Sequence, residues 1–257
     1  MQAREYEIMY QVENEHWWYV GIHDIIFSTL ATYQDRQDMR PWRILDAGCG
    51  TGAVSKRLRR LGEVVAVDLS GLALQFSKRR GLESIVGQAS VTALPFSDDT
   101  FDLVVSIDVL CTVPEQEQAL TEFHRVIKPD GILLMNLPAL DWLKGQHDSA
   151  VNILRRYTPT GLKSQLTQHG FGIEKMTFAN SLLLPFTASY RIISGWLPAG
   201  RNGPRSDVFL LPRPVNSVLR RVMRLESRVI RRTSLPIGMS LLAVARKPVG
   251  EGNRSHR

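Results

Sequence analysis

An apolar run that leads straight into three glycines at alternate positions is the feature that most limits how this chain can fold. The run starts at Ile44 and Leu45, and the glycines are Gly48, Gly50 and Gly52. Glycine adopts positive φ without strain and lets a ligand approach the main chain closely. The N–H groups that begin a following helix can bind a polar ligand. The pattern therefore predicts a buried strand, a tight turn and a helix, with a ligand held at the turn.

Apolar runs and helix-like stretches alternate along the rest of the chain. The further runs predicted to be strands are residues 64–68, 101–108, 131–137, 171–178 and 239–245. The helix-like stretches between them are residues 53–61, 71–80, 114–127 and 160–169. Strands that alternate with helices of about ten residues are typical of right-handed βαβ units. We therefore expect an α/β fold with a Rossmann-like, seven-stranded, mostly parallel sheet flanked by helices.

Changes in the pattern divide the chain into five expected segments. Residues 1–40 form an N-terminal helical cap, with one helical stretch over 4–35, and residues 41–179 form the core. The remaining segments are an apolar and basic insertion at residues 180–236, the last core strand at 237–247, and a disordered polar tail at 248–257.

The insertion combines an apolar stretch with a basic helix. The apolar stretch, residues 181–197, is interrupted by Pro185 and Arg191, so it is shorter than the ~20 apolar residues of a membrane-spanning helix. A basic amphipathic helix is predicted over residues 215–231. The insertion can form a lid or a wall of an acceptor pocket, or it can rest on a membrane surface.

Positive charge is concentrated in one part of the chain. Residues 201–232 contain nine arginines and two acids, Asp207 and Glu226. Their difference of +7 equals the net charge of the whole chain. Such a segment can face nucleic acid, an anionic membrane or an anionic substrate, or it can be a solvated helix face. Two cysteines give no disulfide framework, and the N-terminus lacks the apolar core of a signal peptide. A cytoplasmic protein is expected.

A carboxylate stands at the end of the second predicted strand. Asp68 lies sixteen residues after Gly52, in the segment AVDLS, where a carboxylate can accept both hydroxyls of a ribose. The glycine spacing is G-x-G-x-G, whereas dinucleotide-binding domains have G-x-G-x-x-G. The spacing therefore argues against a dinucleotide.

Two further blocks accompany the turn and Asp68. ALPFSDDTFD covers residues 93–102, and RVIKPDG covers residues 125–131. Together with the turn, they resemble the motifs of the class I S-adenosyl-L-methionine (SAM)-dependent methyltransferases, and the resemblance covers most of the chain. It implies SAM as the cofactor.

The resemblance implies which turn residues bind the cofactor. The aminoacyl-sulfonium part of SAM would lie at Gly48, Cys49, Gly50 and Gly52, and its ammonium group beside Asp46, directly or through water.

The ribose and the adenine would lie farther along the sheet. The resemblance implies that Asp68 binds the ribose, that the next residue, Leu69, also contacts the cofactor, and that the Val91 N–H donates to the adenine. Ser90 stands where the family often has Asp or Asn beside the adenine.

A narrower resemblance concerns a bacterial subgroup with E-x-HWW near the N-terminus and H-D-x-x-x-G-H-x-R-R-Y-T in the C-terminal half. Its members act in natural-product and cell-surface pathways on widely different acceptors. Asn152 and Ile153 replace the glycine and the second histidine of that pattern. If that histidine is a base in relatives, this chain lacks it or uses another group.

Three sets of residues are candidates for work on the acceptor, each with an ordinary structural alternative. Asp108 ends the fourth predicted strand, where open α/β sheets bind ligands, although a carboxylate there can also be a cap. His147 and Asp148 can form a base with its orienting partner, or be a solvated loop pair. Tyr157, with Arg155 and Arg156, can bind an anionic group of the substrate. Alternatively, the two arginines are surface charges and the tyrosine packs against its neighbours.

Aromatic residues near the N-terminus have two interpretations. His16, Trp17 and Trp18 can close over the cofactor and exclude water, or pack a helix onto the sheet. No metal is expected, because the six histidines show no ligand-like spacing.

The sequence thus predicts an enzyme that methylates a small molecule at O, N or C. The acceptor is expected to be hydrophobic or partly anionic, with peripheral membrane contact as a further option and no nucleic-acid partner; the oligomeric state stays open. One alternative is a SAM-binding protein that assists a cyclisation or rearrangement, or serves as a scaffold. An RNA or protein methyltransferase is less favoured, because residues 106–109 (SIDV) lack an N/D-P-P-Y/F motif.

Overall fold

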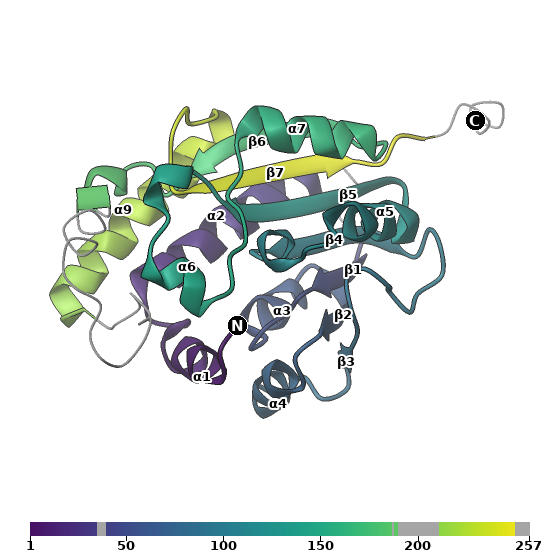
Figure 1. Cartoon of the computed structure of the whole chain (residues 1–257), viewed down its shortest axis with the longest axis horizontal. Helices are drawn as coiled ribbons and strands as arrows, with labels where there is room; N and C mark the ends of the chain where they lie inside the picture. The colour runs from purple at the N-terminus through teal and green to yellow at the C-terminus, as the bar shows by residue number, and fades with distance from the viewer. Residues whose placement is uncertain (35–39, 187, 190–210, 250–257) are drawn as a thin grey trace. The chain divides into compact units, whose positions relative to one another are not determined.

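In the computed structural model, seven strands form one sheet in the order β3-β2-β1-β4-β5-β7-β6 (Figure 1). The structure describes residues 1–34, 40–186, 188–189 and 211–249. The strands are β1 (Trp42–Ala47), β2 (Gly62–Asp68), β3 (Val86–Gln88), β4 (Phe101–Ile107), β5 (Ile127–Pro138), β6 (Gly172–Ala179) and β7 (Ser240–Arg246).

The sheet is mostly parallel, as predicted. β1 pairs in parallel with β2 and β4, β2 with β3, and β4 with β5. β7 runs antiparallel to β5: the Lys247 N–H after the end of β7 donates to Gly131 O near the start of β5, whereas the Ala139 N–H after the end of β5 donates to Met239 O before β7. β4 and β7 are buried over nearly their whole length, which matches their continuous apolar sequence. The predicted Rossmann-like α/β fold is confirmed.

The helices follow the predicted rhythm with small shifts. They are α1 (Ala3–Val12), α2 (Trp17–Gln34), α3 (Ala53–Leu58), α4 (Gly71–Arg79), α5 (Gln116–Val126), α6 (Gln146–Ala150), α7 (Pro159–Gln168) and α9 (Arg213–Arg232), with 3-10 turns at Leu110–Thr112 and Asp141–Leu143. In the described part of the chain, no helix is both long enough and apolar enough to cross a membrane.

The structure differs from the sequence prediction at two places. The helical stretch predicted over 4–35 is two helices, because the chain turns at residues 13–16 between α1 and α2. The short edge strand β3 had no sequence prediction, since its three residues are Val86, Gly87 and Gln88 and carry no apolar run.

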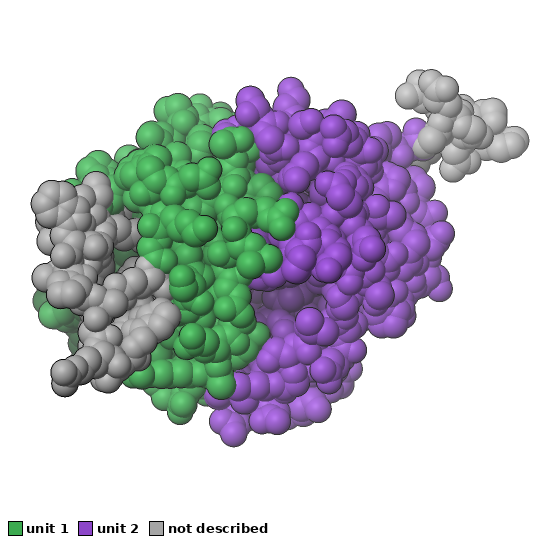
Figure 2. All heavy atoms as spheres, viewed as in Figure 1, with its two compact units in different colours: residues 1–40, 137–158, 177–242 green, residues 41–136, 159–176, 243–257 purple. Residues whose placement is uncertain are grey.

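The chain divides into two compact units, which Figure 2 shows in different colours. Unit 1 consists of residues 1–40, 137–158 and 177–242, and unit 2 of residues 41–136, 159–176 and 243–257. The five segments predicted from the sequence cut the chain differently, and their functional assignment stays a prediction. Parts of the insertion and of the tail, residues 190–210 and 250–257, lie outside the described residues.

Unit 1 is built on the packing of α2 against α9 (Figure 1). Gly21 of α2 lies so close to Met223 of α9 that a Cβ on the glycine would stand 2.6 Å from the methionine Cβ. Asn216 of α9 accepts a 2.9 Å hydrogen bond from the Trp17 N–H at the start of α2. The close approach of the two helices therefore depends on the missing side chain at Gly21.

Replacing Gly21 with alanine should destabilise the chain, although alanine favours a helix by about 1 kcal/mol over glycine. The new methyl group would force α2 and α9 apart, and overpacking of this kind costs about 1–3 kcal/mol. Urea denaturation measures the change. The control Gly87→Ala adds the same group where nothing lies within 4 Å. A Gly21→Ala chain as stable as the wild type would contradict the packing.

Candidate cofactor site and acceptor side

The turn after β1 needs glycine at its first and third positions. Gly48 has φ of 87° and Gly52 of 85°, a region that residues with a Cβ rarely adopt. A Cβ on Gly48 would also collide with the Val109 side chain, and one on Gly52 would lie 2.7 Å from Leu82 Cδ1 and 2.8 Å from Ser77 Oγ. Space and backbone conformation both require glycine, so the predicted turn is a closely packed feature of unit 2.

Asp68 is fixed between the turn and the helix that follows β2. Its Oδ2 accepts a 2.9 Å hydrogen bond from the Gly50 N–H, and its Oδ1 accepts a 2.8 Å bond from the Ser70 N–H. Each carboxylate oxygen can accept more than one hydrogen bond, so both remain able to receive a hydroxyl. Burial raises the pKa of Asp68, and the two backbone bonds oppose that rise. The neighbouring Leu69 is 68% exposed.

Asp46 is a buried carboxyl at the end of β1. It is 2% exposed, and its Oδ2 accepts a 2.6 Å hydrogen bond from Ser55 Oγ. Burial raises the pKa of Asp46 to about 7, and the charge of Asp68 adds to the rise, while the bond from Ser55 opposes it. Because an adjacent cation favours the charged form of a carboxyl, this site is suited to a positively charged ligand group.

Cys49 fills space inside the turn. Its side chain is buried in a small apolar cluster with Ala66 and Leu74. Burial, together with the charges of Asp46 and Asp68, raises the pKa of the Cys49 thiol. The thiolate is therefore disfavoured, and the residue is no nucleophile.

The segment after β3 presents a backbone donor. The Ser90 hydroxyl lies 2.7 Å from Thr92 Oγ1 and accepts a bond from the Thr92 N–H, so this side chain closes its own turn. Val91 is 7% exposed, and its N–H makes no hydrogen bond to any residue in the described ranges. The binding of adenine by this donor, which the resemblance implies, stays a prediction.

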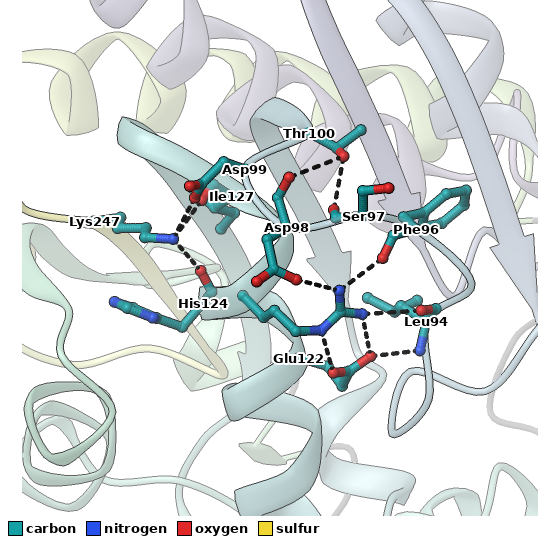
Figure 3. A network of polar contacts seen from close by, with 11 residues as sticks. Leu94, Phe96, Ser97, Asp98, Asp99, Thr100, Glu122, His124, Ile127 and Lys247 are labelled. Atoms are coloured by element: carbon teal, nitrogen blue, oxygen red, sulfur yellow. Dashed lines mark hydrogen bonds and ion pairs between the residues drawn. The ribbon is translucent and has the colours of Figure 1, made fainter.

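A polar network holds the loop that follows Val91 (Figure 3). Arg125 of α5 donates to Phe96 O at 2.6 Å and to Leu94 O at 3.0 Å. Glu122, one turn earlier, accepts the Leu94 N–H at 2.7 Å and pairs with Arg125 at 2.6 Å. The guanidinium lowers the pKa of Glu122.

This network joins the two sequence blocks that accompany the turn. The block at 93–102 supplies the loop, and the block at 125–131 begins with the arginine that holds it. Lys247, after β7, reaches the same region and donates to Asp99 Oδ1 at 2.7 Å and to Ile127 O at 2.8 Å (Figure 3). The two blocks therefore fix the position of the loop.

On the acceptor side, unit 2 brings Asp108 together with Asn136. Asp108 has φ of 54°, and its N–H donates to Asn136 O at 2.8 Å. Asn136 Nδ2 donates to Asp108 Oδ1 at 3.3 Å. Because the next residue, Val109, packs over Gly48, this pair stands beside the cofactor turn.

Asn136 was not predicted from the sequence. It is 1% exposed, and its Oδ1 has no hydrogen-bond partner among the described residues. Buried polar atoms are nearly always paired, so the unsatisfied Asn136 oxygen is an exception, one that it shares with Thr29 Oγ1, Ser106 Oγ, Asn180 Oδ1 and Ser181 Oγ. The available signal was one amide inside the apolar run GILLMNL at residues 131–137.

His16 and Trp17 belong to unit 1, where they form the corner between α1 and α2. His16 is buried, accepts the Trp18 N–H on Nδ1 at 3.3 Å, and stacks obliquely on Trp17 with ring centroids 5.6 Å apart. Asn216, which receives the Trp17 N–H, also donates to Glu15 O at 2.8 Å. These contacts account for packing within unit 1, and a role at the cofactor stays a prediction.

Two residues of the H-D…R-R-Y-T pattern, Asp148 and Arg156, form an ion pair with each other. Asp148 is 1% exposed and receives Arg156 through two bonds of 2.8 and 2.7 Å. Arg156 also donates to Ala139 O at 2.7 Å. Asp148 is thus committed to a buried ion pair, so its use as a catalytic partner stays a prediction.

The other predicted acceptor-side residues are less defined. Tyr157 is buried, and its N–H donates to Pro138 O at 2.9 Å. The side chain of His147 lies outside the described part of the structure. Arg156 is engaged by Asp148, and Arg155 is exposed; the binding of an anionic group by either stays a prediction.

Because the pKa of Asp46 is raised, the ionisation of this residue makes the free energy of unfolding depend on pH. Its ordinary pKa of 3.8 rises to about 7 on folding, so its contribution to stability is fully present below pH 3.8 and is lost as the pH rises through 7. Asp46→Asn cannot titrate. We expect it to gain stability over the wild type by roughly 1.4 kcal/mol per pH unit between these values, then to level off.

Urea denaturation from about pH 4 to about pH 8 measures that difference. Glu63→Gln, at an exposed position on the neighbouring strand β2, is the matched control and should show no such slope. A gain for Asp46→Asn that is the same at every pH would rule out a protonated, buried carboxyl.

Comparison with known proteins agrees with this geometry. Residues 45–135 match the family described as "Methyltransferase domain". A demethylmenaquinone methyltransferase of Lactiplantibacillus plantarum is 32% identical over 146 residues, which are 44% of this chain and 62% of that protein. A malonyl-[acyl-carrier protein] O-methyltransferase of Enterobacter lignolyticus is 36% identical over 102 residues, which are 39% of this chain and 41% of that protein. The chain thus spans about half the length of the curated relatives it matches.

A solved structure extends the likeness to nearly the whole chain. A SAM-dependent methyltransferase from Thermotoga maritima matches with a TM-score of 0.57 and 16% identity, over 95% of each chain. At that identity the likeness concerns the fold. The family predicted from the glycine turn and its accompanying blocks is confirmed: residues 45–135 form a methyltransferase domain of the class I family, whose cofactor is SAM.

Proposed function

We propose that the chain, in the cytoplasm, transfers the methyl group of SAM to a small, hydrophobic acceptor in a natural-product or cell-surface biosynthetic pathway. The observation that carries the proposal is the pair of Asp108 and Asn136 beside the cofactor turn, with the buried Asn136 Oδ1 unsatisfied by any described residue. Such a pair can hold the O–H or N–H of a small acceptor, and methyl transfer needs mainly proximity and orientation.

The turn residues suit the cofactor. Bound SAM supplies a methyl group on a positively charged sulfur and departs as S-adenosylhomocysteine. Asp46 would be ionised by the adjacent cation, and Asp68 would accept the ribose hydroxyls. Gly48 and Gly52 give the turn its conformation and let Val109, Leu82 and Ser77 pack against it.

Asp108 and Asn136 divide the work on the acceptor. Asn136 Oδ1 would accept a hydrogen bond from the reacting group and orient it toward the methyl carbon. Asp108 would take up the proton when an O–H or N–H acceptor loses it. His147 is a second candidate for that base, and Tyr157 and Arg155 stay candidates for binding an anionic group of the acceptor.

The apolar character of the acceptor rests on two observations. The relative from Lactiplantibacillus plantarum is named for a quinone acceptor. In unit 1, residues 181–189 bury Leu184 and Ala188 against Leu143, while Leu182 and Phe186 are 48% and 58% exposed. We propose that such exposed apolar residues form part of an acceptor wall. Apolar acceptors partition into membranes, so peripheral membrane contact belongs to the same proposal.

Asp68→Asn should weaken the binding of SAM by about 10- to 100-fold, because a neutral amide replaces the charged acceptor of two hydroxyl bonds. The amide oxygen can keep one of the two main-chain bonds, and the amide nitrogen cannot accept the other, so circular dichroism of the variant checks that the fold survives. Isothermal calorimetry with S-adenosylhomocysteine measures the change, with Glu63→Gln on the same strand as control. Unchanged affinity would remove Asp68 from the cofactor site.

Asp108→Asn and Asn136→Leu should spare the affinity for SAM and lower kcat. A proton-accepting Asp108 predicts a loss of roughly 100-fold or more with a shifted pH profile, whereas an orienting role predicts a smaller loss. The assay follows release of S-adenosylhomocysteine with a panel of apolar phenols, quinols and carboxylic acids, and with polar amines for comparison.

Asp99→Asn is the matched control, since Asp99 also has positive φ (51°) but precedes β4. Full activity in both Asp108→Asn and Asn136→Leu would exclude these two residues from work on the acceptor. Turnover of the polar amines alone would refute the apolar acceptor and leave the reaction type intact.

A further inference from the structure

The outward surface of α9 carries an apolar stripe. Val215, Val218, Leu225 and Val229 are 44%, 55%, 54% and 37% exposed, and Val222 is half-buried in the same row. Their spacing of three and four residues places them along one face of the helix. The helix has 20 residues, and at a rise of about 1.5 Å per residue the stripe from Val215 to Val229 is about 21 Å long. We call these five residues the outer stripe.

A row of arginines lies beside the outer stripe. α9 contains seven arginines, of which six are exposed: Arg213, Arg221, Arg224, Arg228, Arg231 and Arg232. At 3.6 residues per turn they fall between the outer stripe and the buried face of the helix. Within the described ranges, none of them is in an ion pair with a carboxylate.

The third face of α9 holds the helix in this orientation. Met223 and Ile230 are fully buried, and Met223 packs against Gly21 of α2. Glu226, the only acid in α9, is also buried and accepts the N–H groups of Ser181 and Leu182 at 2.9 to 3.1 Å. The one acidic side chain of the helix is therefore turned inward, and the exposed residues of α9 include no acid.

We infer that the outward surface of α9 docks this protein onto an anionic lipid membrane. The outer stripe would enter the boundary between headgroups and acyl chains, while the arginines beside it meet the anionic headgroups. Charge complementarity favours this partner: a row of exposed arginines repels a second copy of the same surface, and a nucleic acid offers nothing for five aliphatic side chains. The inference concerns where the chain binds and does not depend on the identity of the methyl acceptor.

Vesicle flotation of the full chain tests the inference. The vesicles contain phosphatidylcholine alone or with about one third phosphatidylglycerol, at about 0.05 M and 0.5 M salt. The wild type should float with the anionic vesicles at low salt only. The variant Arg221→Gln/Arg224→Gln/Arg228→Gln should partition about 100-fold more weakly, since each arginine near an anionic surface contributes about fivefold. Leu225→Ser should lose about tenfold through the missing apolar burial.

Matched controls separate the surface from general charge and apolarity. Lys56→Gln/Arg59→Gln/Arg60→Gln removes the same charge from exposed positions in and just after α3, and Ile237→Ser removes an aliphatic side chain that is 47% exposed. Both should float like the wild type. All variants should keep the wild-type affinity for S-adenosylhomocysteine, which shows that they are folded and keeps this test apart from that of the proposed methyl transfer.

Three results would overturn the inference. The first is equal flotation with neutral vesicles, or flotation that the α9 variants do not reduce. The second is a dimer in solution that Leu225→Ser dissociates, with no flotation, which would assign the outer stripe to a second copy. The third is RNA binding that the arginine variant loses and Leu225→Ser keeps, with no flotation, which would assign the surface to nucleic acid.

Discussion

The contact between Gly48 and Val109 is the constraint on which the site in unit 2 depends. It joins the turn after β1 to the loop after β4, and it exists because position 48 has no side chain. The residue before Val109 is Asp108, which is tied to Asn136 at the end of β5. A single missing Cβ thus sets the distance between the cofactor turn and the acceptor-side pair, so a larger residue at position 48 would disturb both at once.

The buried carboxyl groups of this protein differ in how fully their hydrogen-bonding and charge are satisfied by neighbouring groups. Asp148 and Glu226 in unit 1 are satisfied, the first by Arg156 and the second by backbone N–H groups. Asp46 in unit 2 has only the hydroxyl of Ser55, and its pKa rises to about 7. An unsatisfied buried carboxyl lowers stability. Its presence at the cofactor turn is understandable if a cationic ligand completes it.

Local patterns in the sequence predicted most of the fold but only part of the site. The glycine turn, Asp68 and the basic helix carry their signal within a few neighbouring residues, so they could be recognised without any structure. The strand β3 could not, because Gly87 and Gln88 gain a strand conformation only by pairing with β2. Asn136 and the bond between Asp148 and Arg156 depend on which residues the folded chain brings together. The sequence interpretation of Asp148 as a partner of His147 followed adjacency in the chain and stays a prediction, and the structure adds an ion pair with Arg156, eight residues away.

The three faces of α9 also limit what the insertion can do. Its inner residues, such as Met223 and Ile230, are used against unit 1 itself, and its outer stripe faces away from them. The two sets of apolar residues on α9 thus have different surroundings, one buried within unit 1 and the other exposed. If the insertion walls an acceptor pocket, the segment that Glu226 holds in place offers residues for it, because Leu182 and Phe186 remain exposed there. A pocket wall and a membrane surface, alternatives when only the sequence is considered, can then belong to different residues of one insertion and operate together.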